Sequence, residues 1–324
     1  MIAVEPGTGT QIRGLFDLQV NGFGGVDFQR TPSLEEVRYA CERLVGRRMT
    51  QILATFITCE RAALLEKLRR FEDYRRQDKL IRDVIVGYHL EGPYLSAEVG
   101  YRGAHRGDLM KDPDWDEFQK NQDAANGRIR LVTLAPERKG SGEFIQNATR
   151  SGVRISLGHT NASAHEIDIA IGSGATLCTH LGNGCPSEMH RHDNIIQRLL
   201  ARDELIACLI PDGIHLPPNV LKNLYRAKPE GQVILTTDAM AAAGAGPGKY
   251  TIGELELEVA EDKVVRLPGA SNFAGSALSL DEGVCRAQEW LGVSHEKATL
   301  MASSTPAIAL GFDCPDESVD SNLG

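Results

Sequence analysis

Residues 84–93 read VIVGYHLEGP, a short apolar, β-branched run followed directly by polar and turn-forming residues. The run 84–89 has the length of a buried strand, and Gly92-Pro93 marks the turn that ends it. The same arrangement recurs along the chain, in most cases with a helix-like stretch after the turn. The eight runs are 14–20, 51–57, 84–89, 129–134, 153–157, 175–179, 205–210 and 233–237. Eight alternations of strand and helix predict an α/β fold, the (β/α)8 TIM barrel.

The segments between the runs support one barrel domain. Residues 34–48 and 62–76 carry apolar side chains every three or four positions, which predicts amphipathic helices. Residues 250–267 alternate apolar and polar side chains, which predicts a hairpin that leaves the barrel and returns. We therefore expect a barrel over 14–311, with 1–13 and 312–324 as short terminal segments.

Composition narrows the classes of partner and compartment. The chain has 324 residues, of which 42% are hydrophobic, and 35 basic against 44 acidic residues give a net charge of -9. Such a surface repels nucleic acid and anionic membranes, and no apolar run is long enough to cross a bilayer. The first residues lack the basic and apolar parts of a leader, so we expect a cytoplasmic protein. The seven cysteines are scattered, which favours neither a disulfide framework nor a thiolate zinc site.

The residues after the strands are unusually rich in groups that can do chemistry. In a barrel of this type, reactive side chains collect where strands end, so ligands and catalytic groups are expected at those positions. Glu91 follows the third run, His159 the fifth, His180 the sixth, His215 the seventh and Asp238 the eighth. One carboxylate, three imidazoles and a second carboxylate are thus predicted to share one rim.

Glu91, His159 and His180 form the donor set of one carboxylate and two imidazoles that zinc takes at catalytic sites. A metal there would make hydroxide available at neutral pH, and Asp238 could accept the proton of the attacking water. Singly, a strand-end histidine is more often structural, and Glu91 could merely cap a turn. Their joint occurrence favours the metal site. His89 is read as structural, because it lies two residues before Glu91.

At these residues the sequence resembles the N-acetylglucosamine-6-phosphate deacetylases of the amidohydrolase superfamily. The resemblance runs from about residue 14 to residue 311 and implies the same TIM barrel. Its motifs are Phe16-Asp17-Leu18-Gln19-Val20-Asn21-Gly22, residues 89–93, Gly103-Ala104-His105, residues 158–162, 179–186, 212–215 and 236–239, and Ala274-Gly275-Ser276.

The resemblance implies a role for each matching residue. Glu91, His159 and His180 match metal ligands, Asp238 the catalytic acid and base, and His105 the histidine that polarises the amide carbonyl. Arg191 matches an arginine that relatives place on a phosphate across a dimer interface. The implied substrate-binding residues are Ala104, His105, Asn183, Gly184, Arg191, Asp212, His215, Phe273, Ala274 and Gly275.

The sequence departs from the family pattern at several places. Many amidohydrolases carry two histidines on the first strand for a second metal, where this chain has Gln19 and Asn21. Carboxamides are poor zinc ligands, so we expect one divalent metal ion, Zn²⁺ first, with Fe²⁺, Co²⁺ and Ni²⁺ open. The short ends predict that the flanking β-sandwich of relatives is absent or vestigial. Ala54-Thr55 and residues 304–306 also differ from the usual forms.

The activity implied is that of a carbon–nitrogen hydrolase acting on a linear amide. It would release acetate from N-acetylglucosamine 6-phosphate in amino-sugar catabolism, with a small phosphosugar as its partner and neither nucleic acid nor membrane. A homodimer stays open. Two alternatives also stay open: an amidohydrolase acting on another N-acyl sugar or a cyclic amide, and a catalytically inactive barrel that binds a sugar phosphate.

Overall fold

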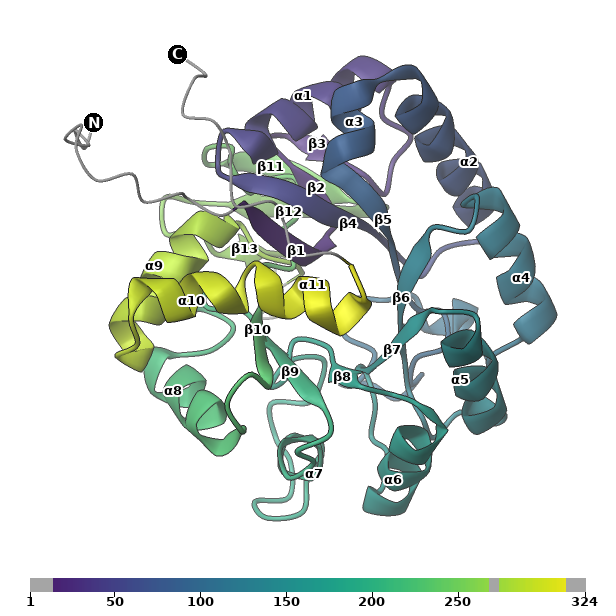
Figure 1. The fold of residues 1–324 in the computed structure, drawn as a ribbon, viewed down its shortest axis with the longest axis vertical. Coiled ribbons are helices and arrows are strands. Elements are labelled where there is room, and N and C mark those ends of the chain that lie inside the picture. Colours follow the sequence, from purple (N-terminus) through teal and green to yellow (C-terminus); the bar gives the residue numbers. More distant parts are fainter. Residues whose placement is uncertain (1–13, 268–273, 313–324) are drawn as a thin grey trace.

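The computed structural model describes residues 14–267 and 274–312, and its centre is an eight-stranded parallel sheet (Figure 1). The order is β1, β4, β5, β6, β7, β8, β9, β10, so each strand lies beside the next along the chain. All eight predicted strands, and with them the (β/α)8 TIM barrel, are confirmed. Their bounds are β1 (Leu15–Val20), β4 (Met49–Ile57), β5 (Ile85–Glu91), β6 (Ile129–Leu134), β7 (Arg154–Leu157), β8 (Leu177–Cys178), β9 (Ile206–Leu209) and β10 (Val233–Leu235).

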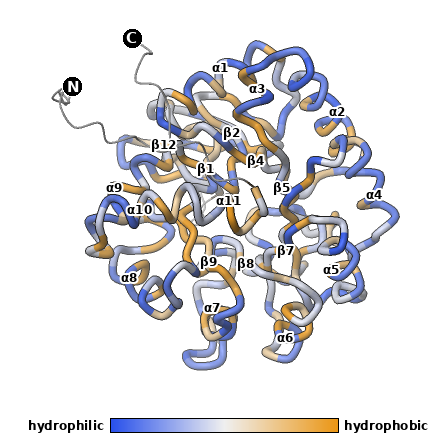
Figure 2. Tube along the Cα trace, in the orientation of Figure 1, coloured by the Kyte–Doolittle hydropathy of each residue, from blue (hydrophilic) through white to orange (hydrophobic). Residues whose placement is uncertain are grey.

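Helices surround the sheet and cover its outer face (Figure 1). Their apolar sides pack on the strands, and Figure 2 shows hydrophobic residues along strands such as β9. Among the described residues the helices are α1 (Leu34–Val45), α2 (Arg61–Gln77), α3 (Lys79–Val84), α4 (Trp115–Ala124), α5 (Ser141–Arg150), α6 (Ala164–Ser173), α7 (Ile195–Leu200), α8 (Pro218–Ala227), α9 (Leu280–Leu291), α10 (His295–Met301) and α11 (Ser304–Leu310). The two predicted helices correspond to α1 and α2.

The interior of the barrel is layered. At the amino-terminal end, Phe16, Leu53 and Ile234 form an apolar layer with residues of other strands, and α11 closes it with Ala307 and Leu310 (Figure 1). Above it lies a polar layer in which His89 Nε2 is 2.7 Å from Thr133 Oγ1. His89 Nδ1 lies 3.1 Å from the carbonyl oxygen of Leu18, so both ring nitrogens have partners within the barrel. These contacts agree with the structural reading of His89.

The first and last strands are joined by side chains more than by a ladder. The buried Asp17 carboxylate accepts hydrogen bonds from the hydroxyls of Thr236 and Thr237, both at 2.6 Å. The amide of Thr237 adds a contact of 3.2 Å to the same carboxylate. Beyond these, a single bridge pairs Val20 with Ala239. Asp17 is therefore the side chain that closes the barrel between β1 and β10.

Two small sheets lie outside the barrel. The predicted hairpin over 250–267 is a three-stranded antiparallel sheet, β11 (Gly248–Ile252), β12 (Leu255–Val259) and β13 (Val265–Arg266). Its apolar side packs on Met240 and neighbouring residues after β10. A shorter pair, β2 (Gly22–Phe23) and β3 (Val26–Asp27), follows β1. The alternating residues that carried the prediction, at 255–259 and 264–267, correspond to β12 and β13; the third strand, β11, was not predicted, because its first residues are glycine and lysine and carry no apolar pattern.

Residues 1–13 and 313–324, on which the expected loss of the flanking sandwich depends, lie outside the described residues. Within the described parts of the chain, no helix combines the length and the apolar character that crossing a membrane requires.

Candidate active site

The proposed catalytic residues stand at the carboxyl-terminal ends of the barrel strands. Glu91 is the last residue of β5, and His159, His180 and Asp238 follow β7, β8 and β10 within three residues. The backbone of the last three is left-handed, with φ of 50° at His159, 29° at His180 and 51° at Asp238. An L-residue adopts such a φ at a cost of about 1 kcal/mol or more. The chain turns sharply at each of the last three positions; Glu91, His159 and His180 are buried, and Asp238 is half-buried.

The imidazoles of His159 and His180 converge on one oxygen of Glu91. His180 Nε2 is 3.0 Å and His159 Nε2 is 3.3 Å from Glu91 Oε1. His105 approaches the other oxygen, with Nε2 3.8 Å from Glu91 Oε2. The structure thus brings together four residues that the sequence places on separate strands and loops.

The donor chemistry of this cluster fits a divalent cation. His159 Nδ1 donates to the carbonyl oxygen of Tyr101 at 2.8 Å, which leaves a lone pair on Nε2 of the neutral ring. That lone pair faces a carboxylate oxygen, and two acceptors 3.3 Å apart repel unless a metal ion or a proton lies between them. Ligands about 2.0–2.2 Å from a tetrahedral ion are themselves roughly 3.3–3.6 Å apart, close to the distances found here.

Two sets of donors share Glu91 and His159. One is completed by His180, whose Nε2 is the imidazole nitrogen nearest to Glu91. The other is completed by His105, with the three donor atoms within 4.8 Å of one another. The first set is the predicted one. Both imidazoles of that set contact Glu91 Oε1, whereas His105 lies farther away, on Oε2; the set with His105 is the one whose donor atoms all lie within 4.8 Å of one another.

Burial and nearby charges shift the pKa values of the two carboxyl groups of the site, Glu91 and Asp238, in opposite directions. Burial alone would raise the pKa of Glu91, but the imidazoles of His159 and His180 beside it hold that pKa well below its usual value. At Asp238, burial and the negative charge of Glu91 raise the pKa to about 6, against the opposing effects of His180, His215 and Asn21. Asp238 is therefore mostly ionised at neutral pH, yet close to the range in which a carboxylate takes up a proton readily.

His105 is held by a threonine at the end of β4. Its Nδ1 lies 3.0 Å from Thr58 Oγ1, a shorter contact than the 3.4 Å from that hydroxyl to the Glu91 carbonyl. Burial and then the neighbouring His159 lower the pKa of His105 to about 3, so the ring is neutral. The Thr58 hydroxyl has one proton. Donated to the Glu91 carbonyl, it leaves the ring proton of His105 on Nδ1; donated to Nδ1, it leaves the ring proton on Nε2, toward the cluster.

Asp212 holds His215 in place. Its carboxylate accepts hydrogen bonds from the amides of Ile214 and His215 at 2.8 and 2.7 Å and lies 2.5 Å from His215 Nδ1. Arg286 donates to the Asp212 carbonyl at 2.7 Å. Burial would raise the pKa of Asp212, but the contact with His215 lowers it. The carboxylate of Asp212, which was predicted as a substrate-binding residue, thus makes its hydrogen bonds to Ile214 and His215 of its own loop.

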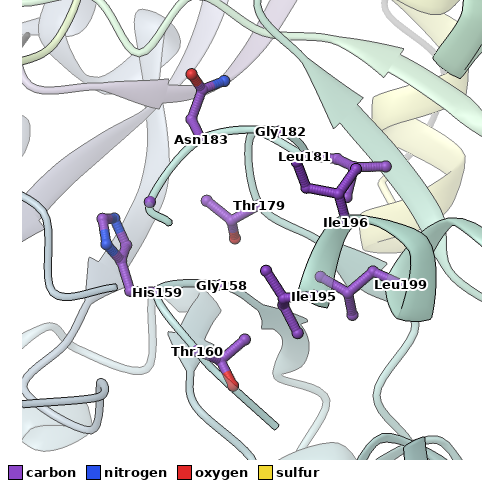
Figure 3. Close-up of a pocket in the computed structure, with 11 residues that line it drawn as sticks. Gly158, His159, Thr160, Thr179, Leu181, Gly182, Asn183, Ile195, Ile196 and Leu199 are labelled. Carbon is purple, nitrogen blue, oxygen red and sulfur yellow. The ribbon is translucent and has the colours of Figure 1, made fainter. Parts of the chain in front are cut away.

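Asn183 and Gly184 line a small pocket beside His159, of about 250 Å³ including its open side (Figure 3). Gly158 and Thr179 lie on one side of it, and Leu181, Ile195, Ile196 and Leu199 on the other. A Cβ at Gly184 would lie 2.9 Å from His159 Nδ1, and its φ is +62°, so only glycine fits here.

The other predicted substrate-binding residues differ in their placement. Ala104 and Ala274 share an apolar cluster with Met240, beside the turn that carries Asp238. Gly275 approaches that turn so closely that a Cβ would lie 3.2 Å from the Asp238 carbonyl. Arg191 is exposed in the loop before α7, and the hydrogen bonds and ion pairs among described residues do not join it to the cluster. Phe273 lies outside the described residues.

Sequence reasoning missed three supporting contacts. Asn21 Nδ2 donates to Asp238 Oδ1 at 2.7 Å, Thr58 contacts His105, and the Tyr101 carbonyl orients His159. Asn21 and Thr58 both follow strands, so the strand-end search could have found them. The Tyr101 contact is made by the backbone, which leaves no signal in the residue type.

Comparison with known proteins places the chain among curated relatives, although no protein-family model matches it. It is 33% identical over 318 residues to the N-acetylglucosamine-6-phosphate deacetylase of Rattus norvegicus, covering 95% of this chain and 76% of that protein. The enzyme of the same name from Homo sapiens is 34% identical, over 93% of this chain and 74% of its own. That from Bacillus subtilis is 30% identical, over 95% and 77%.

Solved structures give the same result. An aspartate-to-alanine mutant of N-acetyl-D-glucosamine-6-phosphate deacetylase from Mycobacterium smegmatis, in complex with N-acetyl-D-glucosamine-6-phosphate, superposes with a TM-score of 0.84 at 31% identity, covering 94% of this chain and 78% of that one. The Pasteurella multocida enzyme gives 0.83 at 29%, covering 93% and 77%. An enamidase of the amidohydrolase superfamily, at 14% identity and a TM-score of 0.52, is alike in fold alone. By its curated relatives and its structural neighbours, the chain belongs to the N-acetylglucosamine-6-phosphate deacetylase family.

Proposed function

We propose that this chain hydrolyses the N-acetyl group of N-acetylglucosamine 6-phosphate to acetate and glucosamine 6-phosphate, a step of amino-sugar catabolism. The observation that carries the proposal is the cluster in which His159 and His180 meet one oxygen of Glu91, in a chain that belongs to the deacetylase family. The same set of donors is typical of hydrolytic metal sites.

The proposed ligands of one divalent ion are Glu91, His159 and His180, with zinc the first choice. When bound, the ion would polarise the amide carbonyl and lower the pKa of the attacking water. The Tyr101 carbonyl holds His159 in the tautomer that leaves Nε2 unprotonated. The carboxylate of Glu91 supplies the negative charge that balances the ion.

Asp238 is the proposed acid and base. Its carboxylate takes a proton from the attacking water as the water oxygen bonds to the carbonyl carbon. The same proton then passes to the 2-amino nitrogen as the carbon–nitrogen bond breaks, which returns Asp238 to its ionised form. His105, neutral and held at Nδ1 by Thr58, would donate from Nε2 to the negative charge that develops on the carbonyl oxygen.

The phosphosugar needs donors in a protein of net negative charge. We assign the phosphate to His215, Asn183 and the amide of Gly184, with Arg191 as the guanidinium, and the sugar ring to Ala104, Phe273, Ala274 and Gly275. Asp212 contributes by fixing the His215 ring rather than by touching the sugar. A guanidinium and backbone amides suit a phosphate dianion.

The setting proposed from the sequence is a cytoplasmic enzyme with one barrel domain over 14–311 and short terminal segments at 1–13 and 312–324. The proposal includes a homodimer, in which the exposed Arg191 would reach the phosphate of a second copy of the chain.

Acetate release tests the function. The metal-loaded chain should release acetate from N-acetylglucosamine 6-phosphate and turn over the unphosphorylated sugar at least about 100-fold less efficiently, because charge-assisted phosphate contacts contribute roughly 3 kcal/mol or more.

Asp238→Asn should lose at least about 100-fold in kcat while keeping its metal. Equal turnover of both sugars, or preference for a cyclic amide, would indicate another amidohydrolase. A metal-loaded chain inert toward all of them would indicate a binding barrel.

A further inference from the structure

We propose that Asn21 is a positioning residue for the reaction: its side-chain amide holds one oxygen of Asp238 and so leaves the other as the atom that carries the proton. The proposal rests on the proposed function only in taking Asp238 as the acid and base. It starts from the contact of 2.7 Å between Asn21 Nδ2 and Asp238 Oδ1.

The chemistry of the contact fixes its direction. An ionised carboxylate only accepts hydrogen bonds, so the Asn21 group that faces it must be the NH2 and not the carbonyl. Among the described residues, Asn21 is the one side chain that donates a hydrogen bond to the Asp238 carboxylate. Proton uptake at Oδ1 would set a hydroxyl against this NH2, so the proton goes to Oδ2.

The backbone around Asn21 keeps the amide in place. Its amide nitrogen donates to the carbonyl of Ala239 at 2.7 Å, and its carbonyl accepts from the amide of Phe28 at 3.0 Å. The first of these bonds attaches Asn21 to the residue directly after Asp238. The backbone at Asp238 is fixed as well, because the Ser276 amide donates to the Asp238 carbonyl at 2.9 Å. The backbone at neither end of the contact can move without breaking a hydrogen bond.

The position of Asn21 is costly for stability alone, which points to a role in the reaction. The side chain is 1% exposed, and its carbonyl oxygen has no hydrogen-bond partner among the described residues. A buried polar atom without a partner costs about 1–3 kcal/mol. An apolar residue of similar size would avoid that cost, but it could not select one oxygen of Asp238.

Two substitutions separate positioning from packing. Asn21→Ala removes the donor and the bulk, whereas Asn21→Asp keeps the shape and replaces the donor by a second acceptor. Positioning predicts that kcat on N-acetylglucosamine 6-phosphate falls about 10-fold to 100-fold in Asn21→Ala, part of the roughly 10²–10⁴-fold that acid–base catalysis supplies. The isosteric Asn21→Asp should fall further, because a carboxylate there repels Asp238. KM and metal content should stay within about 3-fold of the unchanged chain.

Asn121→Ala is the matched control for loss of a buried asparagine. Asn121 lies in α4, is also 1% exposed and has a carbonyl oxygen without a partner among the described residues. The Asn121→Ala variant should lower the melting temperature about as much as Asn21→Ala does, and it should leave kcat unchanged. Activities are compared per folded, metal-loaded molecule.

The inference is overturned if Asn21→Asp turns over faster than Asn21→Ala, or if Asn21→Ala raises KM while kcat is kept. A crystal structure of metal-loaded Asn21→Ala gives a readout that needs no substrate: the Asp238 carboxylate should rotate away from its orientation in the unchanged chain. If it does not rotate, Asn21 does not position it. If the unchanged chain releases no acetate yet the carboxylate rotates, the proposed function fails and the positioning contact stands.

Discussion

Three of the proposed catalytic side chains are attached to backbone that an L-residue seldom adopts. His159, His180 and Asp238 all have positive φ, and each comes within three residues of the end of its strand. At Asp238 the surrounding hydrogen bonds oppose the strain, since Ser276 donates to its carbonyl and Ala239 donates to the hydroxyl of Thr237. Strain of this kind persists where the surroundings fix the backbone, and here it turns each side chain toward Glu91.

Single substitutions of two histidines decide which residues hold the ion. His180→Asn should lower metal affinity by more than about 100-fold, because it removes a direct ligand, which outweighs the 10–100-fold typical of supporting residues. His105→Asn should keep the metal and lose about 10²–10³-fold in kcat, the cost of removing one donor to the developing oxyanion. Elemental analysis of the purified variants, with steady-state kinetics, checks both.

The opposite pattern would change the assignment. If His105→Asn loses the ion and His180→Asn retains it, the ligands are Glu91, His105 and His159, whose donor atoms lie within 4.8 Å of one another.

At the scale of the residue, the sequence predicted which side chains gather but not how they are held. Glu91, His159, His180 and Asp238 could be named because parallel strands end at one rim of a barrel. The contact from Thr58 to His105 and the commitment of the Asp212 carboxylate to its own loop could not, because they depend on side-chain rotamers and loop paths. Local sequence patterns carry no information on either.

At the scale of the element, strands were predicted better than what lies between them. β6 has the predicted bounds, whereas β8 is reduced to Leu177–Cys178 within the predicted 175–179. Thr176 and Thr179 on either side of it still donate backbone hydrogen bonds to Ile155 and Leu157 of β7, so the pairing extends beyond the assigned strand. The six-residue helix α3 was not predicted, because one and a half turns show too little periodicity.

Replacement of the residue that joins β1 to β10 should weaken the whole barrel. Asp17→Asn leaves an amide where the hydroxyls of Thr236 and Thr237 now donate, so at least one buried donor loses its acceptor. The free energy of unfolding should fall by about 2–3 kcal/mol, the range for hydrogen bonds to a charged group. Chemical denaturation measures the change.

Asp123→Asn is the control for the loss of a carboxylate, since Asp123 is exposed near the end of α4. It should change stability by less than about 0.5 kcal/mol. A similarly small change for Asp17→Asn would mean that the bridge from Val20 to Ala239 suffices to close the barrel.

At the scale of the whole molecule, one end of the barrel carries the candidate site and the other end contributes to stability. The carboxyl-terminal end carries the cluster around Glu91, and the amino-terminal end is filled by an apolar layer and covered by α11. Leu310 is 6% exposed in that layer, whereas Ile308 on the same helix is 66% exposed. Stability and chemistry can therefore be changed independently.

Leu310→Ala should lower the free energy of unfolding by about 2–4 kcal/mol, the cost of truncating a buried leucine. It should leave kcat and KM of the folded enzyme unchanged, because the substitution is made at the end opposite the site. Ile308→Ala, which removes an exposed side chain, should alter stability by less than about 0.5 kcal/mol. An altered KM in Leu310→Ala would show that the apolar layer and the site are coupled.

The junction of β1 and β10 differs from the other seven neighbour contacts of the barrel, because one bridge and a few side chains stand in for a ladder. Asn21 lies on one side of it and Asp238 on the other. A transient parting of this seam by an ångström or two would separate the amide from the carboxylate while the remaining strands stayed paired. An opening of this kind would stop catalysis in a molecule whose other strands are still paired, so activity should be lost on heating before the circular dichroism signal changes.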